Sequence, residues 1–346
     1  MVVVGLDLVP QTAQMGADRR YPLFLFSVRL CAICSFFLFA AAAGAGAVER
    51  FEYSAPHMGT LWRVVIYAED AGRAEDAAAA AFARVAELDG VMSDYQAGSE
   101  VRGLGAAPVV VSPDLLAVLI EAKRFGEDSG GAFDVTAGAL TKLWRRAIRR
   151  AELPEEGALQ AAREATGIGG LVISEAERVV RLAKPGMRVD LGGIGKCFAL
   201  DAAMAVLRDG NGVGRALVDA GGDVLAGDGE WTIRVEGNGA PFVVRASRMA
   251  VATSGDLHQG AAIGGRRYSH IIDPRTGIAL DDGAAATVVA PEATAADALA
   301  SALCVVGEED GRALLRKHKR AAARVTRRLP SGDLAVWESE GFPAED

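Results

Sequence analysis

The chain has 346 residues, long enough for one large or two modest domains, and 51% of them are hydrophobic, enough for a substantial core. Its net charge of −8 argues against nucleic acid as the main partner. Four cysteines and four histidines exclude a disulfide scaffold and a histidine-rich metal cage, whereas 41 glycines indicate many turns.

The first 47 residues are typical of a targeting segment. Basic residues flank an apolar stretch, no charge occurs from Leu30 to Val48, and the small residues at 43–47 offer cleavage sites. We expect residues 1–47 to be a secretory signal peptide or an uncleaved N-terminal anchor, because an uncharged stretch of this length can just span a bilayer. Translation starts at Met1 or Met15. The expected location is periplasmic, with inner-membrane anchoring as the alternative.

The mature part, residues 48–346, mixes strand and helix patterns without steady βαβ alternation. It contains no internal repeat and no linker that would divide it, so we expect one compact α+β domain with antiparallel sheets and a helical insertion near 113–166. In the first part of the chain, we expect strands at 51–55 and 61–68, a helix at 71–92 and a strand at 109–111, followed by a helix at 113–128, one that ends at Trp144 and one at 155–166. We then expect strands at 171–174, 179–183 and 187–190, a helix at 194–207, and strands at 215–219, 223–226, 231–236, 242–253, 268–273 and 286–290. The chain should end with helices at 294–306 and 310–319 and strands at 324–329 and 334–338.

Two cysteines remain after residue 47, at Cys197 and Cys304. Both lie in apolar helical patterns, which favours two buried thiols over a disulfide.

The most informative motif is residues 190–196, Asp-Leu-Gly-Gly-Ile-Gly-Lys. A carboxylate ends a strand, two glycines allow another group to approach the backbone, and a helix N-terminus follows, where free N–H groups attract phosphate. It is not a Walker A loop, because Cys197 stands where Ser or Thr must bind Mg²⁺. The alternative is a tight strand-to-helix turn in which Asp190 acts as a cap.

A second motif lies on a predicted helix. Asp297, Ala300 and Ser301 follow at i, i+3 and i+4 and therefore share one helix face. A carboxylate, a backbone carbonyl and a hydroxyl suit a hard cation such as Mg²⁺. The alternative is a capping box made by Thr294 and Asp297.

A third motif is a strand that enters a proline-containing turn at residues 268–277. His270 alternates away from Ile271, so it is either a general base or phosphate donor, or a structural histidine. Residues 273–277 have the composition of a turn, since Asp, Pro and Gly supply its dihedral angles.

These blocks, in this order, resemble the ApbE-type FAD:protein FMN transferases, and the resemblance covers nearly all of residues 50–342. It implies a T-fold-like architecture, export, Mg²⁺ dependence and FAD as substrate. It also implies transfer of FMN through a phosphoester to a threonine or serine of an exported target protein, such as a membrane redox-complex subunit, with release of AMP. The matching blocks are residues 57–60, 92–95, 99–100, 131–136, 190–196, 217–223, 252–256, 269–277, 296–303 and 341–342.

The resemblance also implies roles for individual residues. Asp297 and His270 are the expected catalytic residues, with His270 as the base or proton relay for the incoming hydroxyl. The metal ligands would be Gly193 through its carbonyl, Asp297, Ser301 and the Ala300 carbonyl. The FAD pocket would be lined by Met58, Tyr95, Ala132, Phe133, Asp134, Asp190, Lys196 and Ile272.

The sequence departs from the family pattern at three places, one of which is Leu257, where an aromatic residue often follows Gly-Asp. Cys197 replaces the small glycine that usually follows the motif lysine, and Val135 replaces a usual proline. Two alternatives to the transferase stay open: an FAD pyrophosphatase that gives FMN and AMP, and an exported flavin-binding protein without turnover.

Overall fold

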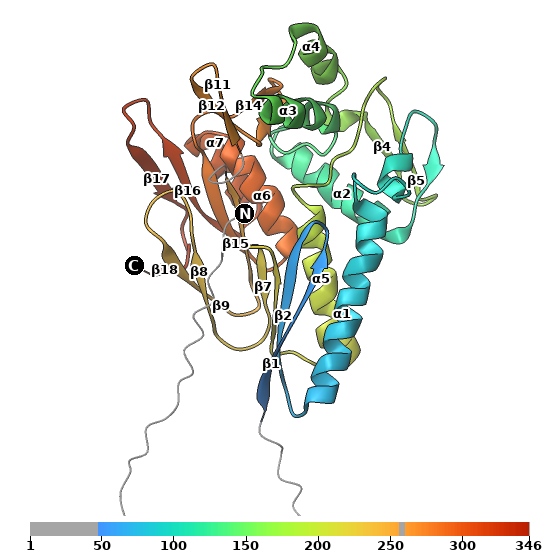
Figure 1. Cartoon of the computed structure of the whole chain (residues 1–346), viewed down its shortest axis with the longest axis vertical. Coiled ribbons are helices and arrows are strands. Elements are labelled where there is room, and N and C mark those ends of the chain that lie inside the picture. The colour runs from blue at the N-terminus through green and yellow to red at the C-terminus, as the bar shows by residue number, and fades with distance from the viewer. Residues whose placement is uncertain (1–47, 256–259, 346) are drawn as a thin grey trace, which may run out of the picture.

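A large antiparallel sheet forms the centre of the protein, which is described by a computed structural model over residues 48–255 and 260–345. Eight strands lie in the sheet in the same order as in the chain (Figure 1). The signal-peptide prediction for residues 1–47 falls outside the described residues. The strands are β1 (Glu49–His57), β2 (Thr60–Ala68), β6 (Ala216–Ala220), β7 (Val224–Ala226), β10 (Ala250–Gly255), β15 (Ala285–Ala290), β16 (Ala322–Arg328) and β17 (Leu334–Glu338).

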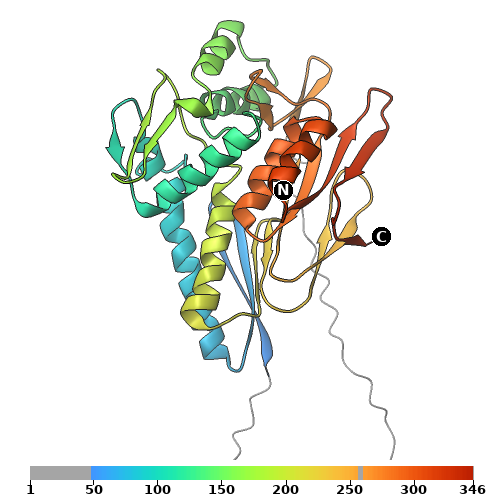
Figure 2. The ribbon, with the colours of Figure 1, turned by 180° about the vertical axis from the view of Figure 1, so that it is seen from behind.

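Helices α1 (Ala71–Met92), α5 (Gly195–Ala205) and α6 (Ala293–Val305) cover one face of this sheet (Figures 1 and 2). Their buried residues are largely alanines and other small side chains, so helix and sheet backbones approach closely. Helix α2 (Pro113–Asp128) packs against α1 and α6, with Ser112 accepting a capping hydrogen bond from the Leu115 N–H at 3.2 Å. The main core therefore lies between the sheet and the helices.

A smaller sheet covers the opposite face. Strand β2 shows why both faces are buried, because Val64 and Ile66 enter the main core while Val65 points to a second core with Trp231 and Ile233. The small sheet contains β8 (Trp231–Val235), β9 (Phe242–Ala246) and β18 (Ala344–Glu345).

A third cluster of apolar residues holds the inserted elements together around Leu140 and Trp144. The Trp144 indole N–H donates to the Gly277 carbonyl at 2.8 Å, which ties the insertion to a late turn of the chain. The remaining elements are η1 (Glu100–Gly103), β3 (Val109–Val110), α3 (Gly138–Arg150), α4 (Glu156–Glu164), η2 (Ile168–Gly170), β4 (Leu171–Ser174), β5 (Val179–Leu182), η3 (Val206–Gly210), β11 (Gly260–Ile263), β12 (Arg266–Ser269), β13 (Ile272–Asp273), β14 (Ile278–Ala279) and α7 (Glu308–Lys317).

The predicted α+β fold with antiparallel sheets is confirmed, and three strand predictions are wrong in detail. The strand predicted at 242–253 is two strands, because the chain turns at Arg248, which has a φ of 52°. Residues 187–190 form no strand and contribute one isolated bridge, between Ala137 and Arg188. The strand predicted at 268–273 is divided between β12 and β13.

Cys197 and Cys304 are both free and buried, as predicted. Over residues 48–255 and 260–345, we find no helix that is long and apolar enough to cross a membrane.

Candidate active site

The loop before α5 folds as a tight turn around its glycines. The N–H groups of Ile194 and Gly195 both donate to the Leu191 carbonyl, at 3.1 and 2.7 Å, and the Asp190 carboxylate accepts from the Gly192 N–H at 2.9 Å. Asp190 therefore stabilises the turn, and α5 begins at Gly195 immediately beyond it. The predicted phosphate-binding loop and the alternative, a tight turn capped by Asp190, are therefore compatible, because the capped turn presents the N-terminus of a helix.

Asp297 is a buried acid in the second turn of α6. Its Oδ2 atom has no hydrogen-bond partner among the described residues, and the Cys197 thiol donates a hydrogen bond to its carboxylate. Burial and the nearby carboxylate of Asp223 raise the pKa of Asp297 to about 7, although Lys196 opposes this rise. A bound cation would therefore strongly favour the ionised form of Asp297 over the protonated form.

The capping-box alternative for Asp297 is wrong. The Thr294 hydroxyl donates to Asp201 of α5 at 2.6 Å, and the backbone N–H groups of Ala293 and Thr294 donate to the same carboxylate. Asp201 therefore caps α6 from a neighbouring helix, which leaves Asp297 available for another role.

Lys196 lies between two acids. Its Nζ is 3.6 Å from Asp223 Oδ2, and Asp223 and Asp297 together raise the pKa of the Lys196 ammonium despite its burial. Asp223 is fixed in turn, because its Oδ1 accepts from the Thr253 N–H at 3.1 Å. This arrangement keeps a positive charge beside the first turn of α5.

Gly193 lies against Ser301, which is one helical turn beyond Asp297 on α6. A Cβ atom on Gly193 would lie 3.0 Å from Ser301 Oγ and 3.4 Å from the Phe133 ring, so a larger residue there would push both side chains away. The Ser301 hydroxyl is 3.1 Å from the Ser254 hydroxyl. Ala300, the fourth predicted ligand, is fully buried on the same helix. The structure thus brings together the residues predicted to hold Mg²⁺, although their role stays a prediction.

A second polar group lies on the Asp190 side of the loop. Arg145 of α3 forms ion pairs with Asp94 at 2.7 Å and with Asp190 at 3.0 Å. Its guanidinium also lies 5.3 Å from the centre of the Tyr95 ring, which is 76% exposed. Burial raises the pKa of Asp190, and Arg145 opposes that rise. Tyr95 therefore presents an open aromatic face beside a charged pair.

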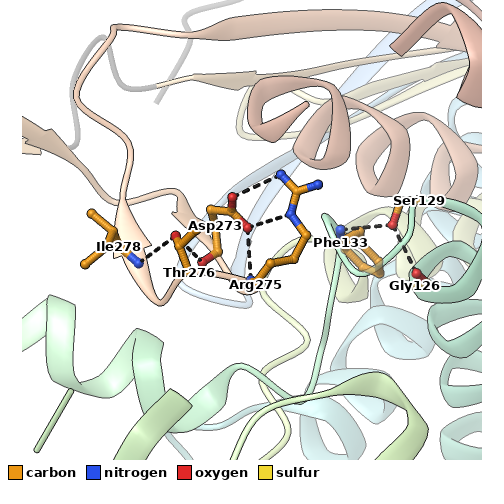
Figure 3. Close-up of polar contacts among 7 residues, drawn as sticks. All are labelled: Gly126, Ser129, Phe133, Asp273, Arg275, Thr276 and Ile278. Atoms are coloured by element: carbon orange, nitrogen blue, oxygen red, sulfur yellow. Dashed lines mark hydrogen bonds and ion pairs between the residues drawn. The ribbon is translucent and has the colours of Figure 1, made fainter. Parts of the chain in front are cut away.

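The turn that carries Phe133 is built by hydrogen bonds of a single serine. Ser129 accepts from the Phe133 N–H at 3.0 Å and donates to the Gly126 carbonyl at 3.2 Å (Figure 3). Ala132 and Phe133 are buried, and the Asp134 carboxylate accepts from the Thr136 N–H and hydroxyl. Burial raises the pKa of Asp134. Phe133 is the member of this group that reaches Gly193.

The neighbouring turn at residues 273–277 matches its predicted turn chemistry. The Asp273 carboxylate accepts from the Arg275 N–H and guanidinium, and the Thr276 hydroxyl accepts from the Ile278 N–H at 3.2 Å, as Figure 3 shows. This turn joins β13 to β14 and places Arg275 against Gly131.

Three further predicted residues, Met58, Ile272 and His270, come from other elements of the fold. Met58, with a φ of 48°, is at the tip of the β1–β2 hairpin. The Thr60 side chain of the same hairpin packs on Gly221, in the turn that leads to Asp223. Ile272 is buried in the third core, and His270 is exposed between β12 and β13. Their roles at the site stay predictions.

Sequence reasoning gave no role to Arg145, Asp223 or Cys197. Asp223 carried a signal in the sequence, because it follows two glycines at the start of a predicted strand, whereas Asp190 precedes a glycine pair. Arg145 carried none, since it is one of four arginines near the end of α3 and no periodicity distinguishes it.

The sequence profile of the ApbE family matches residues 58–325, most of the chain. The chain belongs to the ApbE family. Among ApbE relatives, the FAD:protein FMN transferase of Treponema pallidum is 34% identical over 320 residues, covering 84% of this chain and 87% of its own. The FAD:protein FMN transferase of Escherichia coli K12 is 28% identical, covering 82% and 86%.

Solved ApbE structures have the same fold. The flavin transferase ApbE from Vibrio cholerae superposes with a TM-score of 0.76 at 28% identity, covering 85% of this chain and 98% of its own. The ApbE protein of Thermotoga maritima gives 0.75 at 28% identity, covering 86% and 100%. The resemblance to the ApbE family is thereby confirmed, together with the mixed α and β architecture in one compact unit.

Proposed function

We propose that this chain is an FAD:protein FMN transferase. It would move FMN from FAD to a threonine or serine hydroxyl of an exported protein and release AMP, with Mg²⁺ bound at the Asp297 site. The printed names of its relatives support flavin transfer. The observation that carries the metal-assisted reaction is the buried, unpartnered Asp297 Oδ2 beside Lys196.

The residues around Asp297 fit Mg²⁺, because the predicted donors are all oxygens, which this cation prefers. Asp297, the Ser301 hydroxyl and the carbonyls of Gly193 and Ala300 would hold it. When bound, Mg²⁺ neutralises charge on the pyrophosphate and polarises its phosphorus.

The chain itself supplies a second charge and a helix end. Lys196 is held near the site by Asp223, and its ammonium can pair with a phosphate oxygen. The N-terminal end of α5, which begins at Gly195, would favour the same phosphate through the helix dipole. Together they favour the negative charge that develops at the attacked phosphorus.

The flavin would lie on the side of the loop that carries the aromatic and apolar residues. The exposed Tyr95 ring offers a stacking surface, and Arg145 holds Asp190 and Asp94 beside it. Met58, Ala132, Phe133, Asp134 and Ile272 would complete the pocket.

The nucleophile comes from the acceptor protein, which agrees with the absence of a nucleophile motif in the sequence. The acceptor oxygen attacks the phosphorus of the FMN half, and the bond from that phosphorus to AMP breaks. His270 would accept the hydroxyl proton, since its exposed position lets it meet an incoming chain.

Product analysis separates the three hypotheses. The purified chain is incubated with FAD, Mg²⁺ and a peptide that bears an acceptor threonine, with a threonine-to-alanine peptide as the matched control. Covalent flavin on the threonine peptide alone supports transfer. Free FMN with both peptides would point to a pyrophosphatase, and unchanged FAD would point to a binding protein.

We further propose that residues 1–47 direct export to the periplasm. The support is their sequence, with its apolar stretch between basic residues and small residues. Fractionation of cells that express the full chain, with N-terminal sequencing of the product, tests this. A chain found in the cytoplasm with residues 1–47 intact would overturn the proposal.

A further inference from the structure

Cys197 lies beside Asp297 and Asp223, in the first turn of α5. The thiol sulfur and one oxygen from each carboxylate all lie within 4.8 Å of one another, and the three residues are buried. They come from three different parts of the fold: α5, the turn before β7, and α6. The packed elements around them therefore fix the arrangement in advance of any ligand.

One oxygen of the group, Asp297 Oδ2, is free to accept a hydrogen bond or bind a cation. Asp297 is only 6% exposed, and its Oδ2 has no hydrogen-bond partner among the described residues. A buried carboxylate oxygen without a partner is costly unless a cation or a donor reaches it. Asp223, by contrast, has one oxygen engaged by Thr253 and the other near Lys196.

Sulfur changes which cations this group favours. Mg²⁺ binds oxygen, whereas thiolate ligands favour zinc and other soft divalent cations. Zinc binds cysteine sulfur at about 2.3 Å and carboxylate oxygen at about 2.0–2.2 Å, so three ligands would come to about 3.5 Å from one another. The ligand atoms, all within 4.8 Å of one another, would have to close by at most about 1.3 Å to reach that arrangement.

We propose that Cys197, Asp223 and Asp297 form a site for a thiophilic divalent cation of the Zn²⁺ class, which competes with Mg²⁺ for Asp297. The thiol loses its proton to solvent when the sulfur–metal bond forms, and no electrons are transferred. The fourth position is open to water. Binding of this cation is independent of the proposed function, whereas the inhibition of flavin transfer that we expect from it rests on the proposed function.

Lys196 links this binding to inhibition. Its ammonium lies 3.6 Å from Asp223 Oδ2 and must move away when that carboxylate binds a cation. Occupation of the site therefore removes the Mg²⁺ ligand Asp297 and displaces the lysine that would pair with phosphate. Both effects oppose flavin transfer.

Cadmium provides a direct test, because a cadmium–thiolate bond gives a near-ultraviolet charge-transfer band. The full chain carrying Cys31→Ser and Cys34→Ser is titrated with Cd²⁺. We expect a band that saturates at one cation per chain. In the same background, Cys197→Ser should abolish the band and weaken Cd²⁺ binding at least about tenfold. Cys304→Ser, the matched control, should keep both, because Cys304 donates to the Ser254 carbonyl at 3.3 Å outside the group.

A missing band in the parent protein, or an unchanged band in Cys197→Ser, would overturn the proposal. A second measurement compares Zn²⁺ inhibition at fixed Mg²⁺ within each variant. We expect the Zn²⁺ concentration for half inhibition to rise at least about tenfold in Cys197→Ser and to stay unchanged in Cys304→Ser. A parent protein with the band but no flavin transfer would contradict the proposed function alone.

Discussion

At Asp297, a single side chain combines burial, a missing hydrogen-bond partner and two charged neighbours. Asp297→Asn keeps the shape of the side chain and removes its charge. We expect FMN transfer to fall at least about a hundredfold, because the cation loses its carboxylate ligand while the fold is kept. Rates are measured with saturating FAD and acceptor peptide.

Circular dichroism provides the control for Asp297→Asn, since a native spectrum and an unchanged melting temperature separate lost chemistry from lost folding. Activity close to that of the parent protein would contradict the metal assignment.

The raised pKa of Asp297 predicts a pH dependence of Mg²⁺ binding. Only the ionised carboxylate binds the cation, and its pKa without metal is about 7. The ionised fraction falls from about nine-tenths at pH 8 to about one-tenth at pH 6, so Mg²⁺ affinity should fall about tenfold over that range. Isothermal titration at each pH measures it, and a flat profile would show that Asp297 is not the ligand.

The raised pKa of Asp297 also determines whether its contribution to folding stability rises or falls with pH. A carboxyl whose pKa is higher in the folded chain than in the unfolded chain binds its proton more tightly when folded. The contribution of Asp297 to the stability of the metal-free protein should therefore fall as pH rises from about 4 to about 7, and Mg²⁺ should offset that loss above pH 7.

At the scale of elements, α6 depends on α5 for its start. Asp201 accepts hydrogen bonds from the Ala293 and Thr294 N–H groups and from the Thr294 hydroxyl. Asp201→Ala removes all three and should lower the free energy of unfolding by about 2 kcal/mol. Urea denaturation measures this, with Asp209→Ala, an exposed acid in η3 directly after α5, as the control.

If Asp201→Ala lowers the free energy of unfolding no more than Asp209→Ala does, the cap formed by Asp201 adds no stability. We also expect weaker Mg²⁺ binding in Asp201→Ala, because a frayed α6 holds Asp297 less firmly.

The sequence predicted most elements, because strands and helices with one buried face carry a regular apolar period. It merged β9 with β10, since the run contains no glycine or proline where Arg248 turns the chain. Similarly, the face shared by Asp297 and Ser301 follows from helical spacing alone. The pairing of Lys196 with Asp223 does not, because it joins a helix to a distant sheet turn.

Arg145 shows the same limit within the insertion. Nothing in its local sequence distinguishes it from its neighbours, and its contacts with Asp94 and Asp190 arise only when α3 packs beside the glycine loop. Contacts between distant segments depend on packing, which local periodicity does not encode.

At the scale of the whole molecule, the main core contains residues of the sheet, the covering helices and the insertion. We therefore expect residues 48–346 to unfold in one transition. Trp144→Ala, in the third core, should lower that single melting temperature by several degrees instead of creating a separate early transition. Differential scanning calorimetry distinguishes the outcomes, and two resolved peaks would mean that the insertion is an independent unit.

The strands of the large sheet follow one another from edge to edge in the order in which a ribosome makes them. Each new strand thus finds its neighbour already present. Helix α6 follows β15, so a growing chain carries Lys196 and Asp223 long before it carries Asp297 and Ser301. An unfinished copy has Lys196 and the start of α5 without the three metal ligands predicted on α6. We therefore expect a growing chain to acquire activity only after α6 has been made.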